Sequence, residues 1–300
     1  MTRLSPSLRF ALLCTISLVI GCQTLLRTFA LAVRSDEYTH LLLILPISAA
    51  LILAEGVNLP SAFKPAVGLG SALLVIAVLV GGYARWVVSS QSDAQLTVSM
   101  LALVIWWIGS FVLCFGTRMS RRFLFPLCFL FWLVPIPALA LNKVVAFWQQ
   151  GSATSASVLF SALGIPVVQN GIILSIPGLT LEVAQECSSL RSSLMLIVTS
   201  MVLAHLFLRS LWRKSAVVFT AIPLSIFKNG IRIFTISMLG TRVDPGFLHG
   251  NLHRKGGILF FLLALSVVLL LLWLLNRNES RVSVGAVIAK EPSSASQVPG

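Results

Sequence analysis

Long apolar runs alternate with shorter polar segments along most of the chain. The runs cover residues 10–26, 41–54, 66–83, 96–115, 123–141, 190–208, 215–236 and 257–275. Most of them approach the roughly 20 residues that an α-helix needs to cross the hydrocarbon core of a bilayer. The pattern therefore predicts an all-α polytopic membrane protein with about eight transmembrane helices.

Two polar segments between the runs, 142–189 and 241–256, are long enough to carry a functional site. Within the first, residues 143–163 predict a helix lying along the membrane interface, and 167–183 predict an extended hairpin. Residues 279–300 contain no pattern that could bury a core and predict a disordered cytoplasmic tail. The expected organisation is one transmembrane domain, 1–278, followed by this tail.

Composition and charge agree with a membrane protein. Hydrophobic residues make up 57% of the chain and charged residues 10%, which excludes an ordinary soluble domain. The net charge of +13 would suggest nucleic acid for a soluble protein, but membrane proteins concentrate Lys and Arg in cytoplasmic loops. The dense basic clusters at 118–122 and 209–214 predict that both termini are cytoplasmic and that both long polar segments lie outside. We expect lipids, and no nucleic acid, as partners.

One cysteine differs from the others. Cys187 has polar neighbours, Glu186 and Ser188, whereas the remaining four lie in apolar runs: Cys14, Cys22, Cys114 and Cys128. No Cys-x-x-Cys or Cys/His pairing indicates a metal site. Cys187 directly precedes an apolar helix, whose positive N-terminal end favours a thiolate nucleophile. A lone cysteine is nevertheless more often a small interfacial residue, so its function depends on its context.

Other polar groups supply that context. Asn229 and Arg232 interrupt an apolar span on one helix face, and charges in such positions usually face a cavity or a partner. Snorkelling to the head groups is the alternative, and it suits Lys228 better than Arg232. His249 and His253 precede the last span on the same predicted face as Cys187. Either could shuttle a proton or belong to a basic head-group patch, and their spacing does not choose between them.

In this order the motifs resemble those of the exosortase/archaeosortase family of membrane cysteine transpeptidases. The family has a Cys-Ser-Gly-like motif, then Asn-x-x-Arg, then a His before a final helix rich in Gly and Phe. The matching positions are Cys187-Ser188, Asn229 to Arg232, and His253 followed by Gly256, Gly257, Phe260 and Phe261. Ser189 departs from the usual Gly. A histidine where archaeal relatives tend to carry arginine indicates a bacterial member, located in the cell inner membrane.

The resemblance implies an active site on the outer face and a specific reaction. Such enzymes cleave a C-terminal sorting signal on secreted proteins: a short motif, often Pro-Glu-Pro, then a transmembrane helix and a basic cluster. By this resemblance Cys187 forms a thioester, Arg232 stabilises the oxyanion or the thiolate, and His253 protonates the leaving amine. Supporting positions are Asn229, Ser188, Glu186 and His249. No cofactor is needed, and the acceptor is either an amine or water.

Two other functions fit the sequence. Several kinked spans and an intramembrane arginine also suit a transporter or flippase. A noncatalytic scaffold in exopolysaccharide export is the other alternative. For the scaffold, replacement of Cys187 by alanine would leave function unchanged.

Overall fold

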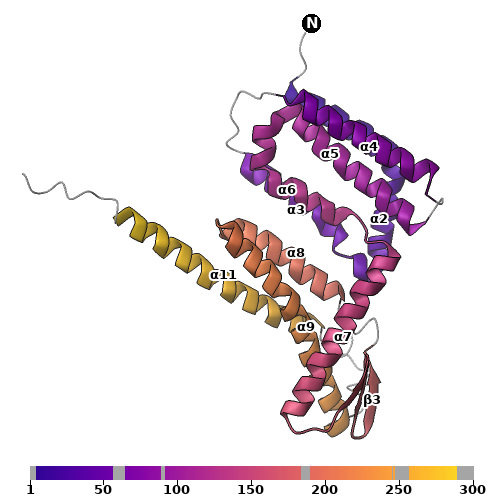
Figure 1. Cartoon of the computed structure of the whole chain (residues 1–300), viewed down its shortest axis with the longest axis vertical. Helices are drawn as coiled ribbons and strands as arrows, with labels where there is room; N and C mark the ends of the chain where they lie inside the picture. The colour runs from indigo at the N-terminus through magenta and orange to yellow at the C-terminus, as the bar shows by residue number, and fades with distance from the viewer. Residues whose placement is uncertain are drawn as a thin grey trace, which may run out of the picture. The chain divides into compact units, whose positions relative to one another are not determined.

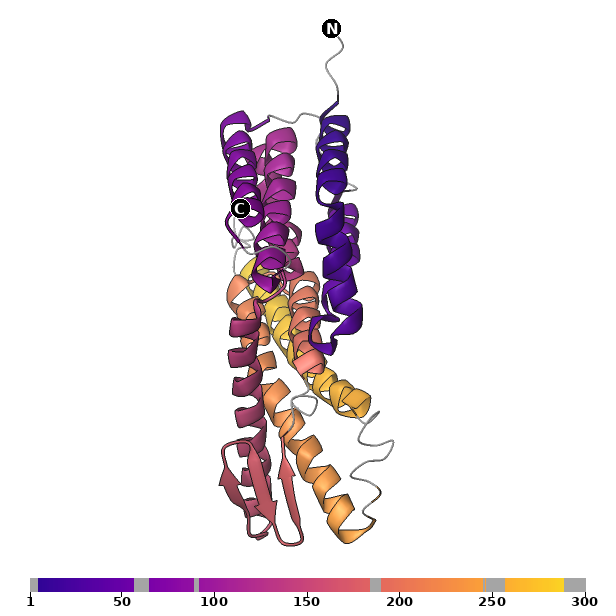
Figure 2. The ribbon, with the colours of Figure 1, turned by 90° about the vertical axis from the view of Figure 1, so that its right-hand side faces the viewer.

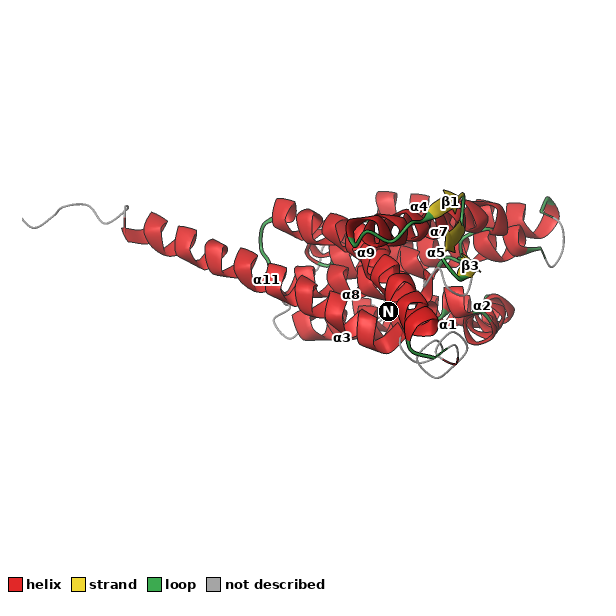
Figure 3. Ribbon diagram, turned by 90° about the horizontal axis from the view of Figure 1, so that it is seen from below, coloured by secondary structure: helices red, strands yellow, loops and turns green. Residues whose placement is uncertain are grey.

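The computed structural model describes residues 5–56, 65–88, 92–183, 190–244, 246 and 257–288. Within these ranges, six helices are long and apolar enough to cross a membrane, or up to eight spans exist if each of two bent helix pairs is one span. Helices dominate, and the strands are confined to a short stretch (Figure 3). The predicted all-α polytopic class is confirmed. The chain divides into two compact units, Met1–Val144 and Val145–Gly300.

The first unit is a helical bundle. It contains α1 (Pro6–Ile20), α2 (Cys22–Arg34), the 3₁₀ helix η1 (Asp36–Tyr38), α3 (Leu41–Gly56), α4 (Val67–Trp86), α5 (Asp93–Arg122), α6 (Leu124–Phe129), the 3₁₀ helix η2 (Leu130–Leu133) and the start of α7 (Ala138–Ala162). Helices α4 and α5 lie side by side (Figure 1). Helix α1 packs on α5, where Trp107 Nε1 donates to Ser17 Oγ at 2.9 Å.

Prolines interrupt the predicted span 123–141. Between η2 and α7 the chain bends by 97°, because Pro135 and Pro137 cannot donate to the helix ladder and disfavour helical geometry before them. Side chains satisfy carbonyls at the break: Thr97 Oγ1 donates to Pro135 at 3.0 Å and Tyr38 Oη to Ile136 at 2.7 Å. The sequence predicted a kink at these prolines, and the helix is indeed broken there. The predicted helix 143–163 exists, as part of α7.

The predicted span 10–26 is also interrupted. Helices α1 and α2 meet at Gly21 with a 70° bend. Glycine favours such an ending since it is a poor helix former, and the sequence changes there from mostly apolar to amphipathic. The predicted span is therefore two helices rather than one.

The second unit combines a small sheet with helices. After α7 come β1 (Val168–Asn170), β2 (Ile173–Ile176), β3 (Leu179–Glu182), α8 (Leu190–Phe207), α9 (Leu211–Arg242) and α11 (Gly257–Ile288). The strands form an antiparallel sheet in the order β1-β2-β3, beside the end of α7 (Figure 2). The predicted hairpin thus has a third strand, because Gly171 and Gly178, with φ of 60° and 83°, make two tight turns rather than one.

Two buried clusters hold this unit together. One joins the sheet to α7 and α9, and contains Ala153, Ala156, Phe160, Leu174, Ile176, Val183 and Ile233. The other joins α8, α9 and α11, and contains Leu196, Ala204, Leu208, Val217, Ala264, Val268 and Leu272. Helix α11 continues to Ile288, beyond the predicted start of the tail at 279. Residues 289–300 lie outside the described residues, so a disordered tail stays a prediction there.

Candidate active site

Helix α9 carries the Asn229 to Arg232 motif, and Asn229 binds helix α7. The Asn229 side chain is 1% exposed, and its Nδ2 donates to Ser152 Oγ at 2.9 Å. Ser152 is itself fully buried. Buried polar groups cost free energy unless they are hydrogen-bonded, so this pair favours one fixed register between α7 and α9.

The two helices also approach closely beside this bond. A Cβ atom on Gly230 would lie 2.4 Å from Ser155 Cβ and 3.1 Å from the Ala156 backbone nitrogen. One turn away on α9, Trp148 Nε1 of α7 donates to Ser225 Oγ at 3.0 Å. Small residues at the contact therefore let the backbones meet, as is common between membrane helices.

Lys228 binds the opposite neighbour, helix α8. Its side chain is only 2% exposed, and its Nζ donates to the Ser192 hydroxyl near the start of α8. The suggestion that Lys228 snorkels to the head groups is therefore wrong. Arg232 is half-buried one turn further along α9 and interacts electrostatically with Lys228. The sequence pattern gave no signal for the Lys228–Ser192 bond, since the two residues are 36 positions apart.

The ends of the segment that contains Cys187 are both anchored. Before it, Val183 is 1% exposed, donates its N–H to Ile172 O at 2.9 Å, and accepts from Gln149 Nε2 of α7 at 2.9 Å. After it, Leu190 is 3% exposed and begins α8. Through Asn229 and Lys228, α9 thus binds the two helices that hold the ends of this segment.

The remaining predicted site residues lie outside the described residues. Cys187, Glu186 and Ser188 fall between β3 and α8, and His249 and His253 fall between α9 and α11. The convergence of Cys187, Arg232 and His253 therefore stays a prediction. In the part of the chain that the structure describes, no group of three or more His, Cys, Asp or Glu residues could hold a metal ion.

The sequence that forms these elements matches a known family. The model of the transmembrane exosortase family (Exosortase_EpsH) matches residues 32–272. The chain belongs to the transmembrane exosortase family. No curated protein and no solved structure shows significant similarity to it.

The exosortase match contains every predicted site residue. It begins near the end of α2 and extends into α11, so it includes α7, the sheet, α8 and α9. The Asn229 to Arg232 motif and the residues that bond Asn229 and Lys228 thus lie within the matched region.

Proposed function

We propose that this exosortase is a cysteine peptidase-transpeptidase that cleaves the C-terminal sorting signal of secreted proteins. The observation that carries this proposal is the pair of bonds from α9, Asn229 to Ser152 and Lys228 to Ser192. These bonds connect the Asn-x-x-Arg region to α7 and α8, the two helices that hold the ends of the Cys187 segment. A nucleophile and an oxyanion donor must be held in fixed geometry, and a rigid framework of this kind supports the proposal.

The proposed reaction uses three residues. The Cys187 thiolate attacks the scissile carbonyl carbon, a C–S bond forms, and Arg232 donates to the resulting oxyanion. The C–N bond then breaks, His253 gives its proton to the departing amine, and a thioester remains. An acceptor amine or water next attacks the thioester carbonyl and gives its proton to His253. The thiolate is released, and the enzyme returns to its starting state.

The length of α9 supports a site near the outer membrane interface. Its 32 residues extend about 48 Å, longer than the roughly 30 Å hydrocarbon core. If the basic cluster at 209–214 marks the cytoplasmic interface, about 20 residues of helix reach the other interface near position 231. Arg232 would then lie where the substrate's transmembrane helix emerges from the lipid. The substrate's basic cluster would lie at the cytoplasmic interface.

Processing of a reporter tests this proposal. A secreted protein that carries a cognate sorting signal is coexpressed with the enzyme or its variants, at matched membrane levels, and cleavage is followed by gel mobility. The decisive variant is Cys187→Ala, for which we expect no processing. Full processing by this variant would overturn the cysteine mechanism.

The same assay separates the roles of the other residues. We expect Arg232→Ala to lower the rate of processing about 100-fold, because an oxyanion donor typically contributes 10²–10³-fold. His253→Ala should lower it by about 10²–10⁴-fold, the usual contribution of a general acid-base group. His249→Ala is the matched control and should process the reporter normally. Equal losses in both histidine variants would contradict the assignment of His253.

Lys228 provides a further prediction. Lys228→Met keeps the side chain's length but removes its charge and its bond to Ser192, so we expect processing to fall about tenfold or more. The variant should remain folded, because an apolar replacement for a buried charge is often neutral or stabilising. Lys214→Met, near the other end of α9, is the control and should keep normal processing. If both variants behave alike, Lys228 has no role at the site.

A further inference from the structure

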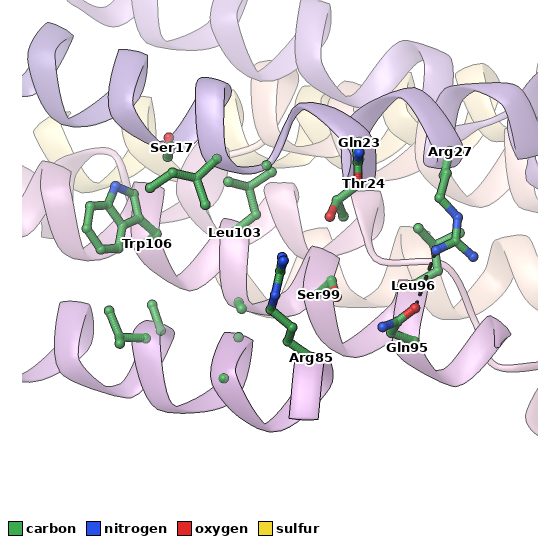
Figure 4. A pocket seen from close by; sticks show the side chains of 17 residues that line it. Ser17, Gln23, Thr24, Arg27, Arg85, Gln95, Leu96, Ser99, Leu103 and Trp106 are labelled. Atoms are coloured by element: carbon green, nitrogen blue, oxygen red, sulfur yellow. Dashed lines mark hydrogen bonds between the residues drawn. The ribbon is translucent and has the colours of Figure 1, made fainter. Parts of the chain in front are cut away.

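A cavity of about 470 Å³ lies within the first unit, between α1, α2, α4 and α5 (Figure 4). Its volume falls in the range of roughly 300–1,000 Å³ that is usual for ligand sites. The candidate active site belongs to the second unit, so this cavity is a separate feature. Nothing in the proposed peptidase reaction uses it.

The cavity exists because the residues that line it on the surrounding helices include several with small side chains, which leave the space between the helices unfilled. The 70° bend at Gly21 turns α2 away from the line of α1. On α4, a Cβ at Gly82 would meet nothing within 4 Å. Other small lining residues are Ala77, Gly81, Ser99 and Ala102. A larger side chain at Gly82 could therefore enter the space without meeting the backbone.

The two ends of the cavity differ in chemistry. One end is apolar, with Leu103 and Trp106 beside Ser17 (Figure 4). The other is polar, and there Arg27 Nη1 donates to Gln95 Oε1 at 3.4 Å. Arg85 also points into the cavity (Figure 4). A ligand that satisfies both ends must be amphiphilic.

The charge of the polar end selects for an anion. Two arginines line the cavity, Arg27 at its polar end and Arg85 between Ser99 and Leu103 (Figure 4), whereas Asp and Glu are missing from the described lining residues. Asp93, the acidic residue nearest to Gln95 in the sequence, begins α5 but is not among the described lining residues. Arginine binds phosphate through paired N–H groups and stays charged at any physiological pH. The basic cluster of a sorting signal would be repelled, so the cavity does not suit that part of the substrate.

The aromatic residues at the end of α4 indicate where this end lies in a membrane. Tyr83 and Trp86 are 54% and 85% exposed and flank Arg85. Exposed Tyr and Trp side chains are enriched at membrane interfaces. The arginine end would thus lie at head-group depth, and the apolar end would face the acyl chains.

We propose that this cavity binds one anionic phospholipid, with its head group in the part of the cavity that Arg27 and Arg85 make positive and part of an acyl chain beside Trp106. Phosphates are the anionic groups that a bilayer supplies at this depth. The proposal does not rest on the peptidase activity, because the cavity and its charges are defined without the Cys187 segment. It can therefore be tested independently of cleavage.

Lipid retention by the purified full-length protein tests the proposal. Delipidated protein is incubated with mixed micelles of equimolar phosphatidylglycerol and phosphatidylcholine and captured by affinity, and bound lipid is measured by mass spectrometry. The wild type should retain phosphatidylglycerol preferentially. The Arg27→Gln/Arg85→Gln double variant should lower this preference about 25-fold, at about fivefold for each arginine.

Three comparisons make the outcome decisive. Arg34→Gln changes another exposed arginine of α2 that does not line the cavity, and it should retain the lipid normally. Gly82→Leu fills the space and keeps both charges, and it should also lose the lipid. Glycerol phosphate, which has no acyl chain, should compete poorly. The lipid site would be overturned if the wild type showed no preference, or if Arg34→Gln lost the lipid as the double variant does. It would also be overturned if Gly82→Leu retained the lipid, or if glycerol phosphate competed at lipid-like concentrations.

Discussion

Replacement of Cys187 by alanine is expected to abolish processing of a sorting-signal reporter, with a loss of at least about 10³-fold. The proposed mechanism has no substitute for the thiolate, because Arg232 and His253 act only on a carbonyl that a nucleophile has attacked. We expect the positive N-terminal end of α8 to favour the thiolate form in the wild type. Hydroxylamine should intercept the thioester in the wild type and release a hydroxamate of the substrate.

Cys22→Ala is the matched control for this variant. Cys22 is an exposed free cysteine in the first unit, so its removal should leave processing unchanged. Cys187→Ala protein should still reach the membrane in normal amounts and give no hydroxamate. A hydroxamate formed by Cys187→Ala would show that another residue forms the acyl-enzyme. Unchanged cleavage without hydroxamate would show that no covalent intermediate exists.

Substitution of Gly230 by valine is expected to prevent α7 and α9 from packing. The new Cβ would lie 2.4 Å from Ser155 Cβ and close to the backbone of Ala156, so α7 itself would have to move. Overpacking of this kind costs about 3 kcal/mol or more when backbone must shift. The movement would also separate Asn229 from Ser152. We expect less monodisperse protein on gel filtration in detergent, a lower melting temperature, and loss of processing.

Two further variants show whether this loss comes from the contact itself. Gly68→Val makes the same change on α4, where a Cβ would meet nothing within 4 Å, and it should have little effect. For the milder variant Gly230→Ala, Ser155→Gly should partly restore stability, because it removes the nearest clashing atom. A Gly230→Val protein as stable as Gly68→Val would contradict the close packing of α7 and α9.

The position of the helix breaks shows how far periodicity predicts this fold. Apolar length predicted the approximate spans, since every backbone group in lipid must be bonded within a helix. The prolines predicted a kink in span 123–141, but not that the chain bends there by 97°. Kinking prolines are tolerated in membrane helices, and the break depends on donors elsewhere in the chain, Tyr38 and Thr97.

The residues of the candidate site were also predicted only in part from the sequence. The sequence pointed to Asn229 and Arg232, because charged and amide groups in an apolar helix cost free energy and usually face a cavity or a partner. Lys228 could not be distinguished from a snorkelling residue, since its partner Ser192 is on another helix. Cys187, His249 and His253 were proposed from their order and their resemblance to the exosortase motifs, and their mutual geometry stays a prediction.

The sequence by itself determined that this chain is a membrane protein and belongs among the exosortases, because the length of its apolar runs and the order of its motifs are properties of the linear chain. Only the tertiary structure decided which polar groups meet: Asn229 with Ser152 across 77 positions, and Lys228 with Ser192 across 36. It also decided that small residues of α4 and α5, with a bend at Gly21, leave a cavity lined by two arginines. Such contacts arise from the packing of helices distant in sequence, which local periodicity does not encode.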